Sequence, residues 1–426
     1  MLPHTRLEAL DDERLNAADK GLPARATGLT VSEFLATGPR LAEFWTPLLS
    51  LDARALQHNA AVVQRWCDER GLELMPHGKT TMAPALWQLQ LDHGATGVTL
   101  ATPGQVRTAR SFGIASIMLA NTLVAPDALE FIAGELADPA FSFHSWADSV
   151  ETVEAMERGL EGVTLPRPID VLVELGGAGG RTGARSVDEA VRVAERIAAS
   201  PVLRLAGTAG YEGSLGHDRS PAALEAVRAY LGEMLEVHEV VRSLADGELI
   251  VSAGGSAYLE LVAEVLAPSI AAESAGAEAA GRTRWILRSG ASLLHDDGFY
   301  HGISPIDGEL IPAMRGYARV VSHPEPGLAL LDGGKRDFPY DEGLPVPFGA
   351  AEAPGARERP LAGTSVTALN DQHAYLRADA PFDLAIGEVV SLGLSHPCTA
   401  FDKWRLIPVV EGGGSDLVVA LVRTYF

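Results

Sequence analysis

Short apolar runs alternate with stretches of helical apolar spacing over the first two thirds of the chain. Eight of these runs have the length of a strand and lie at residues 72–76, 97–101, 116–121, 141–144, 169–175, 203–211, 248–252 and 284–288. Between most of them apolar residues recur every three or four positions, as in residues 186–199 and 221–244, which predicts amphipathic helices.

Strands that alternate with helices pair in parallel through right-handed crossovers. Eight such units predict an α/β fold, a closed (β/α)8 TIM-type barrel. An open doubly wound sheet is the alternative, although no Gly-x-Gly-x-x-Gly follows the first strand.

The pattern changes after about residue 310. Strand-like runs at residues 317–321, 328–331, 364–369, 373–377, 388–392, 405–410 and 417–423 follow one another without long helical stretches, which predicts a C-terminal antiparallel β domain. We therefore expect an N-terminal extension at residues 1–45, the barrel at 46–310 and the β domain at 311–426, with a strand at 46–52 that could instead join the β domain. Residues 349–361, rich in Pro, Gly, Arg and Glu, are expected to form a linker or loop.

Composition narrows the classes of partner. The 426 residues carry a formal net charge of −22, which argues against nucleic acid and anionic membrane surfaces, because both attract basic proteins. The two cysteines, Cys67 and Cys398, form no disulfide framework and indicate a reducing compartment. We recognise no apolar run of membrane-spanning length and no signal peptide, so we expect a cytoplasmic protein without a membrane span.

Chemically useful residues follow the predicted strands, and in β/α barrels the active site lies at the carboxyl ends of the strands. Lys79 follows the first strand, and Gly254, Gly255 and Ser256 follow the seventh, where backbone N–H groups at a helix N-terminus favour a phosphate. A lysine and a phosphate loop at one barrel mouth favour pyridoxal 5′-phosphate (PLP), which needs both. The plainer alternatives are a solvated lysine and a simple tight turn. The other polar residues that we single out at these strand ends are Thr102, Gln105, Arg181 and Tyr211.

A second constellation lies near the C-terminus. His396 and Cys398 are two residues apart, and in an extended segment that spacing directs both side chains to one face. Imidazole and thiolate suit a borderline divalent ion, zinc above all, and two protein ligands leave positions open for water and substrate. The alternative is a buried cysteine beside a hydrogen-bonded histidine. His373, in the Asn-Asp-Gln-His run at 370–373, is a further candidate, either for the substrate or simply for a strand.

Together these motifs resemble the D-serine dehydratase / D-threonine aldolase-like family of fold-type III, alanine-racemase-like PLP enzymes. The motifs are Pro-His-Gly-Lys-Thr at 76–80, Gly-Arg-Thr-Gly at 180–183, Tyr-Glu-Gly at 211–213, Gly-Gly-Ser at 254–256, Asn-Asp-Gln-His at 370–373 and Ser-His-Pro-Cys-Thr-Ala-Phe-Asp at 395–402. The similarity extends from about Trp45 to the C-terminus. It departs from the family's commoner pattern at Gly78, Thr81 and Met82, which bears on the substrate more than on the cofactor.

The resemblance implies a homodimer whose active site lies where the barrel mouth of one subunit meets a β domain, often the partner's. In that family Lys79 matches the Schiff-base lysine, and His396 and Cys398 match the metal ligands. Aldolase relatives tend to carry an aspartate in place of Cys398, so the cysteine favours dehydratase chemistry. We assign to the cofactor Lys79, His77, Thr102, Arg181, Tyr211, Gly254, Gly255 and Ser256, with either Arg181 or Tyr211 at the pyridine nitrogen, and to the substrate His373, Gln105 and Tyr300.

These features predict a PLP- and metal-dependent lyase that eliminates water from a β-hydroxy D-amino acid and yields a keto acid and ammonia. The first alternative is retro-aldol cleavage of the same class of substrate to glycine and an aldehyde, with the same residues. Racemisation is another, but it needs a second base and no metal. The non-enzymatic alternative is a PLP-binding protein without turnover, against which the His396–Cys398 pair argues.

Overall fold

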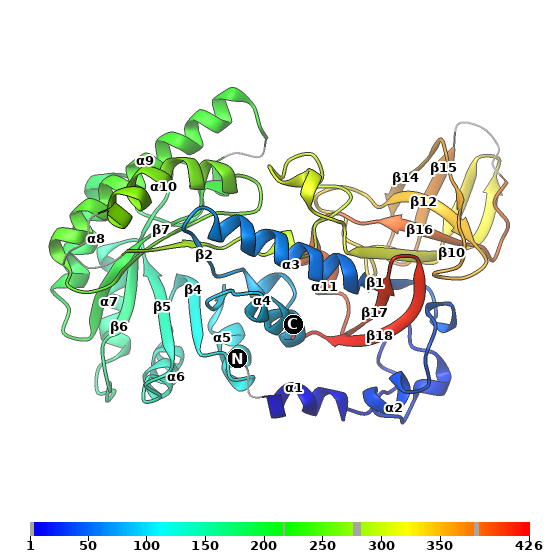
Figure 1. The fold of residues 1–426 in the computed structure, drawn as a ribbon, viewed down its shortest axis with the longest axis horizontal. Coiled ribbons are helices and arrows are strands. Elements are labelled where there is room, and N and C mark those ends of the chain that lie inside the picture. Colours follow the sequence, from blue (N-terminus) through cyan, green and yellow to red (C-terminus); the bar gives the residue numbers. More distant parts are fainter. Residues whose placement is uncertain (1–3, 216–217, 276–282, 379–382) are drawn as a thin grey trace. The chain divides into compact units, whose positions relative to one another are not determined.

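The computed structural model of the protein describes residues 4–215, 218–275, 283–378 and 383–426. The chain folds as two compact units, which are described separately (Figure 1). The first consists of residues 64–79 and 90–290, and the second of residues 80–89, 291–426 and the described residues up to 63.

The first unit is built on eight parallel strands in the order β2-β9-β8-β7-β6-β5-β4-β3 (Figure 1). A parallel bridge between His77 and Thr99 joins the two ends of this order, so the ring of strands is closed. The predicted barrel is therefore confirmed over the open sheet, and a strand lies at each of the eight predicted positions. The strands are β2 (Glu73–Leu74), β3 (Val98–Leu100), β4 (Ser116–Thr122), β5 (Ser142–Ala147), β6 (Ile169–Leu175), β7 (Leu203–Gly210), β8 (Leu249–Ala253) and β9 (Thr283–Leu287).

Helices connect successive strands of this unit. They are α5 (Pro103–Ser111), α6 (Pro126–Glu135), α7 (Val150–Gly159), α8 (Val187–Ala198), α9 (Pro221–Leu244) and α10 (Leu259–Ala275), while α3 (Ala53–Asp68) and α4 (Pro84–Asp92) belong in part to each unit. Serine side chains begin the two helices predicted from apolar spacing: Ser186 Oγ accepts the N–H of Glu189, and Ser220 Oγ that of Ala223. None of the described helices combines the length and the apolar character needed to cross a bilayer.

The inside of the ring is filled by side chains. Eight of them form one cluster, each at most 2% exposed, namely Met75, Met118, Trp146, Leu172, Ala206, Ala209, Ile250 and Ile286. Apolar burial of this kind is the main force that holds a barrel together. Because the interior is packed, a ligand can approach only at the ends of the strands.

The second unit contains a ten-stranded sheet whose pairs are antiparallel, apart from β1 with β17. This confirms the antiparallel β domain. Its strands are β1 (Leu48–Asp52), β10 (Met314–Glu325), β11 (Leu328–Leu331), β12 (Val346–Ala351), β13 (Arg359–Pro360), β14 (Thr364–Leu369), β15 (Ala374–Ala378), β16 (Val389–Gly393), β17 (Leu406–Gly412) and β18 (Ser415–Arg423). The early strand β1 lies between β10 and β17, and the helices are α1 (His4–Asp11), α2 (Val31–Leu35) and α11 (Pro397–Phe401).

The expectation of a linker or loop at residues 349–361 is wrong in part. Gly349 and Ala350 of β12 pair antiparallel with Pro360 and Arg359 of β13. The proline content of this segment predicts a loop rather than a strand, because proline lacks an N–H. Since β13 ends the strand order, Pro360 occupies an edge position, where a missing donor is tolerated.

The close approach of β7 and β8 provides a test of the barrel. Gly207 has φ +144, and a Cβ there would lie 1.9 Å from the carbonyl oxygen of Ile250. We expect Gly207→Ala to destabilise the protein by about 3 kcal/mol or more, because backbone must move to accept the methyl group. Gly232, inside α9, has no heavy atom within 4 Å of the corresponding position. Gly232→Ala should stabilise by about 0.5–1 kcal/mol. Urea unfolding followed by circular dichroism measures both, and equal midpoints for the two variants would contradict this packing.

Candidate active site

Lys79 lies at the carboxyl end of β2, in the short 3-10 helix Gly78–Thr80. The chain contains four lysines, at positions 20, 79, 335 and 403. Of these, Lys79 is the one that belongs to the barrel unit. If the barrel holds an aldehyde cofactor on a lysine, the primary structure leaves Lys79 as its attachment point.

The other residues predicted to bind the cofactor also follow barrel strands at their carboxyl ends. His77 follows β2, Thr102 follows β3, Arg181 lies in the loop after β6, Tyr211 follows β7, and residues 254–256 follow β8. Parallel strands in one ring present their carboxyl ends at the same face, so the fold collects all of these loops at one mouth.

Arg181 and Tyr211 lie together, as the assignment of both to the pyridine ring requires. The Arg181 guanidinium is 5.1 Å from the centre of the Tyr211 ring, and both residues line a small pocket with Glu174 and Thr182. Gly213 makes room for the aromatic ring, because a Cβ there would lie 2.6 Å from Tyr211 Cζ. Gly255 does the same, since its Cβ would lie 2.9 Å from Tyr211 Cε2.

The glycine loop after β8 differs from the expected phosphate cradle. The fully buried carboxylate of Glu212 accepts the N–H of Gly254 at 3.0 Å and that of Gly255 at 2.5 Å. These two donors are therefore engaged by the protein itself, and helix α10 begins only at Leu259. The hydroxyl of Ser256 in this loop lies 2.7 Å from that of Ser289, which follows β9; both residues are buried, and the two hydroxyls suit a phosphate. No sequence pattern singles out Glu212, because its partners lie more than forty positions away along the chain.

Several buried polar atoms of the barrel unit have no hydrogen-bond partner among the described residues, and they include Glu174 Oε2, Arg288 Nε and His77 Nδ1. Buried polar atoms are nearly always paired, so such a group indicates a polar ligand. Glu174, the last residue but one of β6, accepts a hydrogen bond from Thr182 Oγ1 at 2.7 Å through its other oxygen. Arg288, directly after β9, donates to Ser252 Oγ and to the Gly210 carbonyl, both at 2.6 Å. A polar aldehyde with a ring nitrogen fits this set, and sequence patterns identified neither Glu174 nor Arg288.

Charges at the mouth set the protonation of these groups. Burial raises the pKa of Glu174, against the hydrogen bond from Thr182. Burial, together with the positive charges of Lys79, Arg288 and Arg181, holds the pKa of His77 well below its usual value, so its ring is neutral at pH 7. His77 can therefore accept as well as donate a proton.

Thr102 and Gln105 make hydrogen bonds at the start of α5 that neither support nor oppose their predicted roles in binding cofactor and substrate. Thr102 Oγ1 accepts the N–H of Gln105 at 3.3 Å and so begins α5, while Gln105 Oε1 accepts the N–H of Ala101 at 2.9 Å. This reciprocal capping accounts for both side chains structurally. Their contacts with cofactor and substrate stay predictions.

In the second unit His396 and Cys398 come together, although not through an extended segment as expected. His396 has φ 45 in the left-handed region, and α11 begins at Pro397, so Cys398 lies in the first turn of a helix. The two side chains still interact across this turn, since Cys398 is among the groups that raise the pKa of His396. Cys398 Sγ also lies 3.5 Å from Oγ1 of Thr80, the residue that follows Lys79 in the sequence.

Asp341 orients His396. Its Oδ2 lies 2.6 Å from His396 Nδ1, and its Oδ1 accepts a hydrogen bond from Thr399 at 2.7 Å. With Nδ1 engaged by a carboxylate, Nε2 is the nitrogen left for an ion, the arrangement common in metal sites. Burial opposes charge on the imidazole, but the thiol of Cys398 and the carboxylate of Asp341 outweigh it and raise the pKa of His396 to about 9. Imidazole nitrogen and thiolate sulfur are donors that a borderline divalent ion accepts, so the donor set fits such an ion.

The two remaining substrate candidates lie in different settings. Tyr300 is half-buried, and its N–H donates to Oδ1 of Asp296 at 2.8 Å. Oδ2 of the same carboxylate accepts the N–H of His396 at 3.1 Å, so Asp296 connects the Tyr300 segment to the backbone of His396. His373 is exposed in the turn between β14 and β15. Both assignments stay predictions.

Comparisons with known proteins agree with this fold. Residues 51–266 match the alanine racemase N-terminal domain, and residues 313–410 match the serine dehydratase domain. A D-threonine aldolase of Arthrobacter sp is 27% identical over 388 residues, which are 88% of this chain and 92% of that protein. A D-threo-3-hydroxyaspartate dehydratase of Delftia sp. (strain HT23) is 25% identical over 387 residues, which are 87% of this chain and 95% of that protein.

Solved structures are similar over almost the whole chain. A D-threonine aldolase from Filomicrobium marinum superposes with a TM-score of 0.75 at 24% identity, over 91% of this chain and 97% of that one. A D-threo-3-hydroxyaspartate dehydratase solved as a cysteine-to-alanine mutant in the metal-free form has a TM-score of 0.71 at 21% identity, over 91% of this chain and 99% of that one.

The match to the alanine racemase domain covers more than half of the 426 residues, and the serine dehydratase domain follows it in the β unit. The barrel, its single lysine and the polar groups around it agree with that assignment. The chain therefore belongs to the fold-type III PLP enzymes, in the family of the D-threonine aldolases and D-threo-3-hydroxyaspartate dehydratases.

Proposed function

We propose that the protein is a PLP- and metal-dependent dehydratase that eliminates water from a β-hydroxy D-amino acid and yields a keto acid and ammonia. The observation that carries this choice is the His396–Cys398 pair, oriented by Asp341. Overall similarity does not choose between the outcomes, because the aldolase and the dehydratase relatives are 27% and 25% identical. Cys398 favours elimination of water, because the family resemblance associates an aspartate at this position with aldolases.

Lys79 has two tasks in this reaction. Its Nζ would hold the cofactor through a covalent bond, and as a free amine it would remove the proton from the substrate Cα. PLP, when bound, supplies the conjugated ring that stabilises the negative charge developing at Cα. His77 lies close enough to Lys79, Arg288 and Arg181 for their positive charges, together with burial, to lower its pKa.

The barrel loops would hold the rest of the cofactor. Ser256 and Ser289 would receive the phosphate, beside a glycine loop that Glu212 keeps in place. Arg181 and Tyr211, stacked together, would lie near the pyridine ring. Glu174 Oε2, Arg288 Nε and His77 Nδ1 would then find the partners that the described residues do not provide.

A divalent ion would be held by His396 Nε2 and the Cys398 thiolate, with zinc as the ion that this donor pair favours. Held there, it would supply Lewis acidity for the β-hydroxyl, which is otherwise a poor leaving group. The cysteine-to-alanine mutant of a D-threo-3-hydroxyaspartate dehydratase, solved in the metal-free form, supports the involvement of a cysteine and a metal in this family. We also propose a cytoplasmic homodimer; the two cysteines are free, which suits a reducing compartment.

Retro-aldol cleavage is the second candidate, favoured by the aldolase relatives. It uses the same amine and ion but breaks the Cα–Cβ bond instead of the Cβ–O bond. A PLP-binding protein without turnover would not need an oriented pair of metal ligands, and His396 and Cys398 argue against it.

Cofactor attachment is tested by reduction. Borohydride treatment of the PLP-loaded protein should fix the cofactor on the peptide that contains Lys79, as mass spectrometry would show. Lys79→Ala should lose this adduct together with the visible absorbance, and its activity should fall by about a thousandfold or more. The matched control Lys335→Ala should keep all three. An adduct on Lys20, Lys335 or Lys403 would refute the assignment.

Products decide between elimination and cleavage. With D-threo-3-hydroxyaspartate we expect oxaloacetate and ammonia. With D-threonine we expect 2-oxobutyrate and ammonia. An aldolase would instead release glycine, together with glyoxylate from the first substrate or acetaldehyde from the second.

The role of the metal is tested separately. Cys398→Ala and chelation should both abolish turnover and leave the cofactor absorbance, because the ion acts on the hydroxyl. The other cysteine gives the control: Cys67→Ser, at a buried thiol within α3, should retain its metal dependence. Full activity of Cys398→Ala in chelator would eliminate the metal role.

Glu212 is expected to act as a positioning residue for the phosphate loop. In Glu212→Gln, one N–H of the loop would face an amide NH2 instead of an oxygen, and an unpaired buried N–H costs about 1–3 kcal/mol. We expect PLP to bind the apoprotein about tenfold more weakly or worse, as measured by titration. The exposed control Glu161→Gln should bind normally. Unchanged PLP affinity in Glu212→Gln would show that the loop does not depend on the carboxylate.

A further inference from the structure

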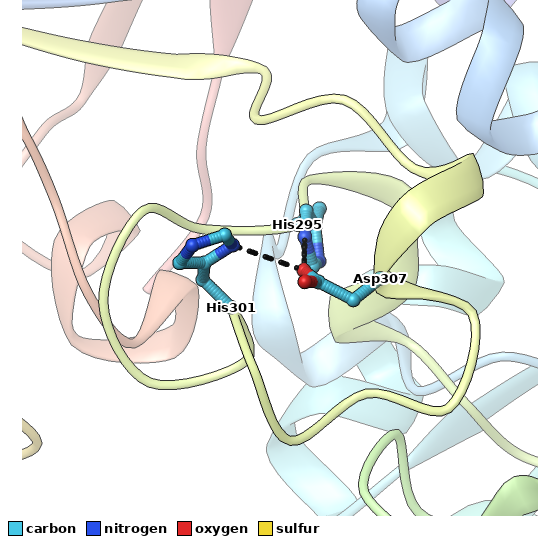
Figure 2. Close-up of side chains that lie close together, drawn as sticks. All are labelled: His295, His301 and Asp307. Carbon is cyan, nitrogen blue, oxygen red and sulfur yellow. Dashed lines mark hydrogen bonds and ion pairs between the residues drawn. The ribbon is translucent and has the colours of Figure 1, made fainter.

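Three side chains outside the His396–Cys398 pair converge on one point of the second unit (Figure 2). His295 Nε2 lies 2.8 Å from Oδ1 of Asp307, and His301 Nδ1 lies 3.1 Å from the same oxygen. All three ligand atoms lie within 4.8 Å of one another. Figure 2 shows both imidazoles directed at the carboxylate of Asp307 from opposite parts of one loop.

The spacing of these atoms suits a small divalent cation. Zinc binds imidazole nitrogen and carboxylate oxygen at about 2.0–2.2 Å, so two ligand atoms of a tetrahedral site lie roughly 3.3 Å apart. The distances from His295 Nε2 and His301 Nδ1 to Asp307 Oδ1 are a few tenths of an ångström shorter than this separation. They are hydrogen-bond distances, as expected when no ion lies between these atoms. Small rotations of side chains would be enough to admit an ion.

The backbone holds the first of these ligands in an uncommon conformation. Among the described residues outside glycine, positive φ occurs at Met82, His295 and His396, and His295 has φ 41. Its imidazole is almost completely buried, with an exposed fraction of 2% for the side chain. Such a backbone persists only where the surroundings enforce it, and it is concentrated at functional sites. His396, the proposed ligand of the other ion, shares this conformation.

The neighbouring carboxylate makes the loop rigid. Asp296 is buried, and its Oδ1 accepts the N–H groups of Gly298 at 3.1 Å and Tyr300 at 2.8 Å. His295 itself donates its N–H to the carbonyl of Ala291 at 2.9 Å. The segment between the two histidines is thus organised by its own hydrogen bonds, and His301, with a side chain 65% exposed, leaves one side of the cluster open to water.

We infer that His295, His301 and Asp307 bind a divalent transition-metal ion, of which zinc is representative, at a site separate from the His396–Cys398 pair. Three protein ligands with one position open to solvent make a complete zinc coordination sphere once water is added. The ion would replace the two hydrogen bonds of Asp307 and tie the loop at 295–301 to the short 3-10 helix Asp307–Glu309. Because no thiolate takes part, this ion is held by nitrogen and oxygen alone.

Metal stoichiometry tests the site on the full-length holoenzyme. After equilibrium dialysis against zinc, we expect about two ions per chain in the wild type and about one in each of His301→Ala, Asp307→Asn and Cys398→Ala. The double variant His301→Ala/Cys398→Ala should hold none. His301 is exposed, so its removal should leave the thermal unfolding curve of the metal-stripped protein unchanged. The control is His58→Ala, since His58 contacts the backbone oxygen of nearby Glu309 but lies outside the cluster, and it should keep two ions.

Cobalt substitution assigns each ion to its site. Cobalt at the His396–Cys398 pair should show a thiolate charge-transfer band, which His301→Ala retains and Cys398→Ala loses. Zinc content in His301→Ala and Asp307→Asn equal to the wild type overturns the inference, and so does the loss of both ions from either variant. If Cys398→Ala keeps both ions while His301→Ala loses one, the inference stands and the metal ligands of the proposed function fall.

Discussion

The closure of eight parallel strands into one ring is the constraint on which the candidate site depends. The bridge from His77 to Thr99 completes the ring directly beside Lys79. Closure gives every loop that follows a strand the same mouth, and the apolar interior leaves no other place for a polar ligand. Polar atoms that stay unpaired within this packed shell, on Glu174, Arg288 and His77, therefore indicate what the mouth is built to receive.

Carboxylates do much of the positioning in both units. Glu212 accepts two N–H groups of the glycine loop. Asp341 contacts Nδ1 of His396 and so orients the ring. Asp296 holds the loop that leads from His295 to Tyr300 and also the backbone of His396. Each of these side chains accepts hydrogen bonds from donors that would otherwise be unpaired, which keeps the functional groups in one arrangement. Asp307 adds a fourth case, in which the carboxylate itself is a proposed ligand.

Periodicity predicted most of the fold because it reports burial directly. The strands and helices of the barrel repeat an alternation that the sequence displays, and helix α9 has the predicted bounds 221–244. Lys79, Arg181 and Tyr211 could be selected because each follows a strand. Glu212, Asp341 and Arg288 could not, because their partners lie 42, 55 and 36 positions away along the chain. The left-handed backbone at His396 likewise replaced the expected extended segment, since no pattern of apolar residues encodes a single φ angle.

The central claim is that Lys79 carries PLP in the mouth of the barrel. A crystal structure of the PLP-loaded protein tests it most directly. We predict continuous density from Lys79 Nζ to the cofactor, with the phosphate against Ser256 and Ser289. Density for PLP on another lysine, or a phosphate bound far from those two hydroxyls, would contradict the account.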